Sequence, residues 1–144
     1  MGAKQANDAW EGVLTAHAVF MRQFARTDVW SGASMREYDV LYTLSKCDEG
    51  QRLSDLQEHV LLSQPALSRL VDRLVDRGLV SRCEDPVDGR AVRVSLTPEG
   101  AQIQHEIGRR HAADVADAMA ALTDDEQRQL ASLTAKLVSR KDKS

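Results

Sequence analysis

The sequence has little cysteine, and the little it has does not suggest a metal site or a disulfide framework. Its two cysteines, Cys47 and Cys83, lie far apart, and neither belongs to a CxxC pair. Zinc ribbons and disulfide-stapled domains need more cysteines at closer spacing. We therefore predict two free thiols and no metal or other cofactor. A redox role would need a lowered thiol pKa, for which the sequence gives no support.

Long apolar runs are also missing. No stretch approaches the roughly 18 consecutive apolar residues that cross a bilayer, and residues 1–10 are too polar for a secretory signal. We expect a cytoplasmic protein that does not enter a membrane. The 144 residues, 42% hydrophobic and 28% charged, are typical of a single globular domain spanning 1–144.

The chain lacks an excess of positive charge. Its formal net charge is -3 and its sequence pI is about 5.8, which excludes the basic body of a non-specific nucleic-acid coat protein. Between residues 63 and 96, six arginines stand against five acidic residues. Any contact with DNA must therefore come from the position of particular arginines rather than from the total charge.

Catalytic signatures are absent as well. The sequence contains no GxSxG, GxxxxGKS/T or GxGxxG motif, so acyl transfer, nucleotide hydrolysis and dinucleotide chemistry lack their usual signatures. The best metal-site candidate is His105-Glu106 with His111. These histidines are six residues apart and would point roughly 120° from each other on a helix, unlike an HExxH pair. We predict that the protein is not an enzyme and has no catalytic residues.

What the sequence does contain is a series of amphipathic helices. Apolar residues recur at helical spacing in most of the chain, and strict alternation in one region predicts a β-hairpin. The expected helices are Asn7–Arg26, Ser34–Lys46, a short one from Ser54 to before Ser63, Ser63–Gly78, Pro98–Leu122 and Thr123–Val138, and the expected strands are Leu79–Cys83 and Ala91–Leu96. The predicted fold class is mainly α with a small β-hairpin.

Several of these helices begin with a capping signal. A serine or threonine followed three residues later by Glu or Gln can satisfy free backbone N–H groups at both positions. Three such capping boxes are expected: Ser34 with Glu37, Ser54 with Gln57, and Thr123 with Glu126. The helix from Ser63 begins instead with a serine cap and an early proline, both of which suit a helix N-terminus.

Two short helices joined by a tight turn and followed at once by a hairpin have the order of a winged helix-turn-helix. The second helix, Ser63–Gly78, has one apolar face and one polar face. Its leading residues are short or able to hydrogen-bond base edges in the major groove, which admits one α-helix. The residues expected to contact DNA from this helix are Ser63, Gln64, Pro65, Ala66, Ser68, Arg69 and Arg73.

Arg69 and Arg73 lie four residues apart on the polar face. We assign Arg69 to a base, because a guanidinium can fork onto guanine, and Arg73 to a phosphate. The alternative is that Arg69, Asp72, Arg73 and Asp76 only pair along a solvated face, each pair contributing about 0.2–0.5 kcal/mol.

The tip of the hairpin favours contact with DNA. Arg90 follows a glycine in a protruding turn and would enter the adjacent minor groove or contact its phosphates. Asp88 would orient the Arg90 guanidinium through a charge-assisted hydrogen bond.

The segment Leu53–Gly100 contains LSDL, LLSQPALSRLVDRLVDRGLV and DPVDGRAVRVSLTPEG, and it resembles the DNA-binding core of MarR-family (multiple antibiotic resistance regulator) transcription regulators. The resemblance implies that Ser63–Arg73 is the recognition helix and that Arg90, supported by Asp88, is the wing arginine. It also implies a homodimer that represses transcription from a pseudo-palindromic operator on double-stranded DNA. Segments 7–33 and 98–140 would be its dimerisation helices, and 34–97 its winged helix-turn-helix.

Regulators of this kind often release DNA when a small aromatic or phenolic effector binds between the dimerisation helices and the winged domain. Trp10, His17, Asp39 and Tyr42 come from elements that would line such a crevice. The alternative is that the rings pack in the dimer core and Asp39 is a surface acid. Some relatives sense peroxide through a cysteine in the first helix, but residues 7–26 contain none.

A different class of function is a winged helix used only as a protein-interaction module, without specific DNA binding. Such a module would not need Gln64, Arg69 and Arg90 at exposed tips. Substituting the two arginines would separate the two hypotheses.

Overall fold

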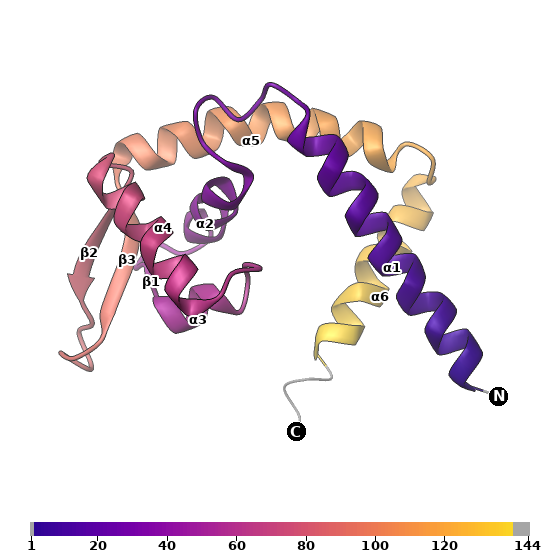
Figure 1. Cartoon of the computed structure of the whole chain (residues 1–144), viewed down its shortest axis with the longest axis horizontal. Coiled ribbons are helices and arrows are strands. Elements are labelled where there is room, and N and C mark those ends of the chain that lie inside the picture. Colours follow the sequence, from indigo (N-terminus) through magenta and orange to yellow (C-terminus); the bar gives the residue numbers. More distant parts are fainter. Residues whose placement is uncertain (1, 140–144) are drawn as a thin grey trace. The chain divides into compact units, whose positions relative to one another are not determined.

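The computed structural model describes residues 2–139, which form six helices and one small sheet (Figure 1). In chain order the elements are α1 Gly2–Ala25, α2 Met35–Ser45, β1 Gln51–Arg52, α3 Leu53–Gln57, α4 Gln64–Asp76, β2 Val80–Glu84, β3 Val92–Leu96, α5 Pro98–Met119 and α6 Asp124–Ser139. The predicted mainly α fold with a small β element is confirmed. No helix among these residues is long and apolar enough to cross a membrane.

The chain divides into two compact units, one ending at His111 and the other beginning at Ala112. The boundary therefore falls within α5. Arg140, the last residue of the predicted 98–140 dimerisation segment, lies outside the described residues.

In the first unit, α2, α3 and α4 gather beside the sheet, and the β2–β3 loop projects away from them (Figure 1). This arrangement is held by one core of apolar side chains, since burying a Leu or Val side chain stabilises a fold by about 1.5–3 kcal/mol. Its fully buried members are Val40, Leu41, Leu44, Leu56, Leu67, Val71, Leu74, Val80 and Val94. The amphipathic pattern read from the sequence of α4 therefore places its apolar face in this core.

The sheet has three antiparallel strands in the order β1-β3-β2, so the predicted two-stranded hairpin was incomplete. The additional strand, β1, pairs Gln51 with Val94 and Arg52 with Arg93. Two residues are too few for an alternating pattern to appear in the sequence. The chain enters β1 through Gly50, whose φ is 77° and where a Cβ atom would lie 2.6 Å from the carbonyl oxygen of Val94. Only glycine suits that close approach.

The capping boxes at Ser34 and Thr123 are confirmed by reciprocal hydrogen bonds with Glu37 and Glu126. The one predicted at Ser54 is wrong. Helix α3 follows directly from β1, its N-cap is Arg52, and no side chain caps it. Strand pairing of residues 51 and 52 places the N-cap two residues before the serine, so the helix begins at Leu53.

A second cluster joins the segment after α1 to α2 and to the first half of α5. Trp30, Tyr38 and Ile107 are its buried members. The imidazole of His111 lies among the rings of Phe24, Trp30 and Tyr38, at centroid distances of 4.8, 4.9 and 5.6 Å. This histidine is therefore part of an aromatic cluster of the first unit.

Two helices have no buried residues within the single chain. In α1, Trp10, Val13, Leu14 and Val19 are exposed, and in α6 the exposed apolar residues are Leu130, Leu133, Leu137 and Val138. These helices carry apolar stripes as expected from the sequence. Phe24, at the end of α1, packs against the second cluster, but the apolar residues just named stay exposed in the single chain.

Candidate nucleic-acid interface

Helix α4, the predicted recognition helix, begins with the predicted serine cap. Ser63 is the N-cap, and its Oγ accepts a hydrogen bond from the backbone N–H of Ala66 at 3.3 Å. Pro65 stands in the first turn, where a missing N–H costs nothing. The expected contact residues Ser63, Gln64, Pro65, Arg69 and Arg73 are exposed, whereas Ala66 and Ser68 are half-buried.

The acidic residues on α4 do not neutralise its arginines. Asp72 forms its ion pair with Arg82 of strand β2 rather than with a residue on its own helix. Within residues 2–139, neither Arg69 nor Arg73 forms an ion pair. The alternative of charge pairing along the helix face is therefore not what the structure shows.

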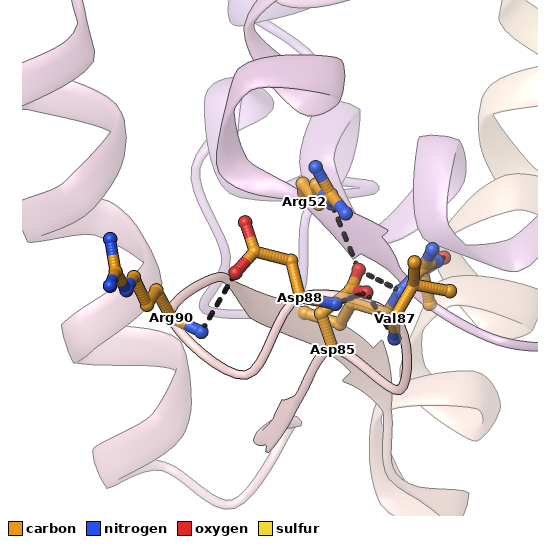
Figure 2. Close-up of polar contacts among 7 residues, drawn as sticks. Arg52, Asp85, Val87, Asp88 and Arg90 are labelled. Carbon is orange, nitrogen blue, oxygen red and sulfur yellow. Dashed lines mark hydrogen bonds and ion pairs between the residues drawn. The ribbon is translucent and has the colours of Figure 1, made fainter.

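The β2–β3 loop is built around the buried carboxylate of Asp85 (Figure 2). One of its oxygens, Oδ1, accepts the backbone N–H groups of Val87 at 2.9 Å and Asp88 at 3.0 Å. The other, Oδ2, accepts from Nε of Arg52 at 2.9 Å and from Nε of Arg93 at 2.7 Å. These bonds, that from Arg52 first, hold the pKa of Asp85 far below its usual range.

This Asp85 cluster was not anticipated from the sequence. Its two arginines come from different strands, β1 and β3, and meet because Arg52 is paired with Arg93 in the sheet. Only knowledge of the register could have brought them to one carboxylate. The result is a loop whose backbone is held by hydrogen bonds of Asp85 with Val87, Asp88 and Ala91 within the protein itself.

Arg90 lies on the far side of this loop and is exposed (Figure 2). The Oδ1 atom of Asp88 accepts the backbone N–H of Arg90 at 3.1 Å. The predicted bond from Asp88 to the Arg90 guanidinium is absent among the described residues, so Asp88 orders the turn instead. The guanidinium remains available to a ligand.

The ion pairs sort the six arginines of residues 63–96 into two groups. Three have carboxylate partners: Arg77 with Glu37, Arg82 with Asp72, and Arg93 with Asp85. The other three, on the exposed side of α4 and on the β2–β3 loop, have none within residues 2–139; they are Arg69, Arg73 and Arg90. These guanidinium groups are therefore exposed and without an ion-pair partner there, on a chain whose net charge is negative.

An ion pair connects α2 to the C-terminal end of α4. Oε1 of Glu37 closes the capping box of α2, while Oε2 accepts from Nη1 of Arg77 at 2.9 Å. Arg77 is the C-cap residue of α4. Glu37 therefore links the start of α2 to the end of α4.

A cavity of about 340 Å³ lies within the first unit beside α2 and contains three of the four expected effector residues. It is lined by His17, Met21, Arg36, Asp39, Tyr42, Thr43, Lys46, His59 and Leu61. The fourth, Trp10, is not in its lining and is 58% exposed elsewhere on α1. A larger hollow of about 490 Å³ runs along α6 alone and contains none of these residues.

The cavity carries more positive charge than the sequence suggested. Arg36 donates to Asp39 at 3.4 Å, and Nζ of Lys46 stands 4.3 Å from the centre of the Tyr42 ring. Burial raises the pKa of Asp39, and Arg36 opposes that shift. Arg36, Asp39, Thr43 and Lys46 share one face of α2, so the helical spacing could have identified the two cations.

The candidate metal-site residues do not come together. No group of three or more His, Cys, Asp or Glu side chains within residues 2–139 is placed to hold a metal ion. His105 is exposed on α5, while His111 lies in the aromatic cluster described above. Cys47 is half-buried and accepts a hydrogen bond from Gln51, and Cys83 is exposed on β2.

Comparison with known proteins gives consistent matches. The sequence model of the MarR family matches residues 33–92. The HTH-type transcriptional repressor MdtR of Bacillus subtilis is 30% identical over 106 residues, covering 74% of this chain and 68% of MdtR.

Two similar solved structures are a mutant MarR from E. coli complexed with operator DNA and the PcaV transcriptional regulator from Streptomyces coelicolor in complex with its natural ligand. The MarR structure is 26% identical with a TM-score of 0.72, covering 88% of this chain and 91% of that one. The PcaV structure is 26% identical with a TM-score of 0.67, covering 91% of this chain and 89% of that one.

Proposed function

Because this chain belongs to the MarR family of transcription regulators, we propose that it represses transcription as a homodimer bound to a pseudo-palindromic operator, with no catalytic role. The observation that carries the proposal is a set of three exposed arginines without an ion pair in residues 2–139: Arg69 and Arg73 on α4, and Arg90 on the β2–β3 loop. The remaining arginines of this region are used in internal ion pairs. An interaction module would have no need for that division.

In this proposal α4 lies in the major groove with its N-terminal residues toward the bases. Arg69 donates to O6 and N7 of a guanine, while Arg73 holds a phosphate. Gln64 and Ser68 are close enough along the helix to contact neighbouring base edges. Arg90 enters the minor groove next to it, where the negative potential attracts a guanidinium. The complex of MarR with operator DNA supports this placement through the shared fold.

The homodimer would use the helices that the single chain leaves uncovered. Exposed apolar stripes on α1 and α6 are the kind of surface that a second copy buries. We assign segments 7–33 and 98–140 to dimerisation and 34–97 to the winged helix-turn-helix. A two-fold dimer predicts half-sites about one helical turn, or 10 base pairs, apart. The repressor name of MdtR favours repression over activation.

The cavity beside α2 is the proposed effector site. His17, Asp39 and Tyr42 line it together with Arg36, Lys46 and His59. An aromatic ring that carries a phenolic or carboxylic group suits this mixture of a tyrosine ring and cations. Ligand binding there would shift α2 and, through Glu37 and Arg77, the recognition helix. The ligand-bound PcaV structure supports a ligand-regulated mechanism.

The DNA-binding proposal is tested by measuring affinity for an operator duplex with Arg69→Ala and Arg90→Ala variants. Loss of a bidentate base contact costs about 1–3 kcal/mol, so Arg69→Ala should weaken binding by roughly 5- to 150-fold and relax specificity at one base pair. Arg90→Ala should weaken binding to all sequences more evenly. Lys4→Ala, which removes an exposed positive charge, ion-paired with Asp8, from the start of α1, controls for the change in net charge. Unchanged affinity in both arginine variants would contradict the proposed interface.

The effector proposal needs a separate experiment. Hydroxybenzoate-type compounds are titrated into the protein–DNA complex, and release of the labelled duplex is followed. Lys46→Gln should raise the ligand concentration that releases half of the DNA without changing DNA affinity in the absence of ligand. If Lys46→Gln releases DNA at the same ligand concentration as the wild type, the cavity is not the effector site.

A further inference from the structure

We propose that Arg52, the last residue of β1, is a further DNA-binding residue that holds a backbone phosphate between α3 and the β2–β3 loop. The proposal rests on the DNA-binding function proposed above and adds a contact from a strand that the sequence did not reveal. Arg52 belongs neither to the recognition helix nor to the loop that carries Arg90.

The position of Arg52 is set by its strand pairing and by its place at the start of α3. Across the sheet it is paired with Arg93, and along the chain it is the N-cap of α3. In helix-turn-helix proteins the helix before the recognition helix crosses the DNA backbone. A cation at the start of α3, next to the β2–β3 loop, is therefore placed where a DNA phosphate would lie.

The guanidinium of Arg52 is anchored at one edge and open at the other. Its Nε donates to Oδ2 of Asp85 at 2.9 Å, and within residues 2–139 its terminal Nη1 and Nη2 groups make no hydrogen bond. The side chain is 37% exposed. Figure 2 shows its free end directed away from Asp85. A guanidinium offers five N–H donors in a fixed fork, so the open edge can take a phosphate while Nε keeps its partner.

Anchoring makes such a contact more favourable. An arginine free in solvent loses side-chain freedom when it binds, and that loss weakens binding. In Arg52 the buried carboxylate of Asp85 has already restricted the side chain. The hydrogen bond to Asp85 raises the pKa of Arg52, and the nearby carboxylates of Asp88 and Asp55, which form no ion pair with it, add smaller contributions.

Arg93 shows what a purely structural arginine looks like at the same carboxylate. It donates from Nε to the same Oδ2 atom at 2.7 Å, but its Nη1 group is used by the carbonyl oxygen of Gly50 at 3.2 Å. Its side chain is 26% exposed. Arg93 is therefore a matched control: replacing it removes one guanidinium from Asp85 without removing a phosphate contact.

The experiment compares Arg52→Gln, Arg93→Gln and the wild type by fluorescence anisotropy on one operator duplex at several salt concentrations. Each phosphate contact contributes about 0.9 to the slope of log affinity against log salt, so two copies of Arg52 in a dimer should contribute about 1.8. We expect Arg52→Gln to lower the slope by that amount and Arg93→Gln to leave it unchanged. Equal slopes for all three proteins would overturn the assignment of Arg52, while failure of the wild type to bind would overturn the proposed function instead.

If Arg52→Gln does not unfold cooperatively in urea, Arg52→Lys replaces it. Wild-type and Arg52→Lys proteins are then compared on duplexes in which single phosphates are replaced by neutral methylphosphonates. The proposal predicts one position in each half-site where the replacement weakens the wild type more than the variant. Equal weakening of both proteins at every position would show that Arg52 only supports the loop.

Discussion

Replacing Gly100 by alanine should destabilise the fold, because there is no room for a methyl group where α5 begins. A Cβ atom at this position would lie 1.9 Å from the carbonyl oxygen of Leu79 and 2.8 Å from its carbonyl carbon. Both atoms belong to the backbone of Leu79, the residue before β2, so the clash cannot be relieved by rotating a side chain. The first turn of α5 is also held there by Thr97, which accepts the N–H of Gly100 and donates to the carbonyl oxygen of Gly78.

The expected magnitude follows from two opposing effects. Overpacking a close contact costs about 3 kcal/mol at the upper end of its usual range, and Gly→Ala in a helix gains about 1 kcal/mol at most. Gly100→Ala should therefore lower the free energy of unfolding by about 2 kcal/mol, measured by urea denaturation at a fixed protomer concentration.

Gly89→Ala is the matched control for this experiment. Gly89 lies in the β2–β3 loop, outside the segments assigned to dimerisation, and nothing is within 4 Å of the position of its Cβ atom. This variant should be as stable as the wild type or about 0.4–1 kcal/mol more stable. A Gly100→Ala protein as stable as Gly89→Ala would refute the close packing of α5 against Leu79.

Three further predictions concern single side chains. Ser63→Ala should cost about 0.5–1 kcal/mol of stability, since the cap bond of 3.3 Å is long and exposed; Ser63→Asp should keep the cap but lose DNA affinity, because its charge faces the phosphates. The wild type should lose stability as pH falls below the ordinary carboxyl pKa of 3.8, since the folded-state pKa of Asp85 is lowered; urea midpoints of Asp85→Asn should be lower at neutral pH and depend less on acid. The pKa of Asp39 is raised, so its effect has the opposite sign: Asp39→Asn should be more stable than the wild type at neutral pH, and the difference should vanish below pH 3.8. An Asn variant at either position whose urea midpoints follow the wild type across this range would contradict the corresponding pKa shift.

Features that depend on local sequence could be predicted, and the helix caps show why. The boxes at Ser34 and Thr123 involve residues three positions apart, so their geometry follows once a helix forms. The box at Ser54 has the same sequence pattern but does not form, because pairing of β1 with β3 starts α3 at Leu53. Contacts between segments distant in the sequence overrode the local signal.

In the candidate site, too, local features could be predicted from the sequence and contacts between distant segments could not. The polar face of α4 and the exposed Arg90 could be read from the sequence, since both depend on helical period and turn residues. Whether the α4 arginines are paired could not, because the partner of Asp72 is on β2. The role of Arg52 was hidden for the same reason, since it depends on the register between two strands.

The most direct test is to measure whether the wild-type protein binds DNA with sequence specificity. Fluorescence anisotropy would be followed with a labelled duplex from the region upstream of its own gene, over a salt series and against unlabelled scrambled duplex, because affinity without stated salt cannot be interpreted. We expect binding that survives excess scrambled competitor and whose log affinity falls linearly with log salt. Two results would contradict sequence-specific DNA binding. One is that scrambled DNA displaces the labelled duplex as readily as unlabelled upstream duplex does, and the other is that no binding is detected even at low salt.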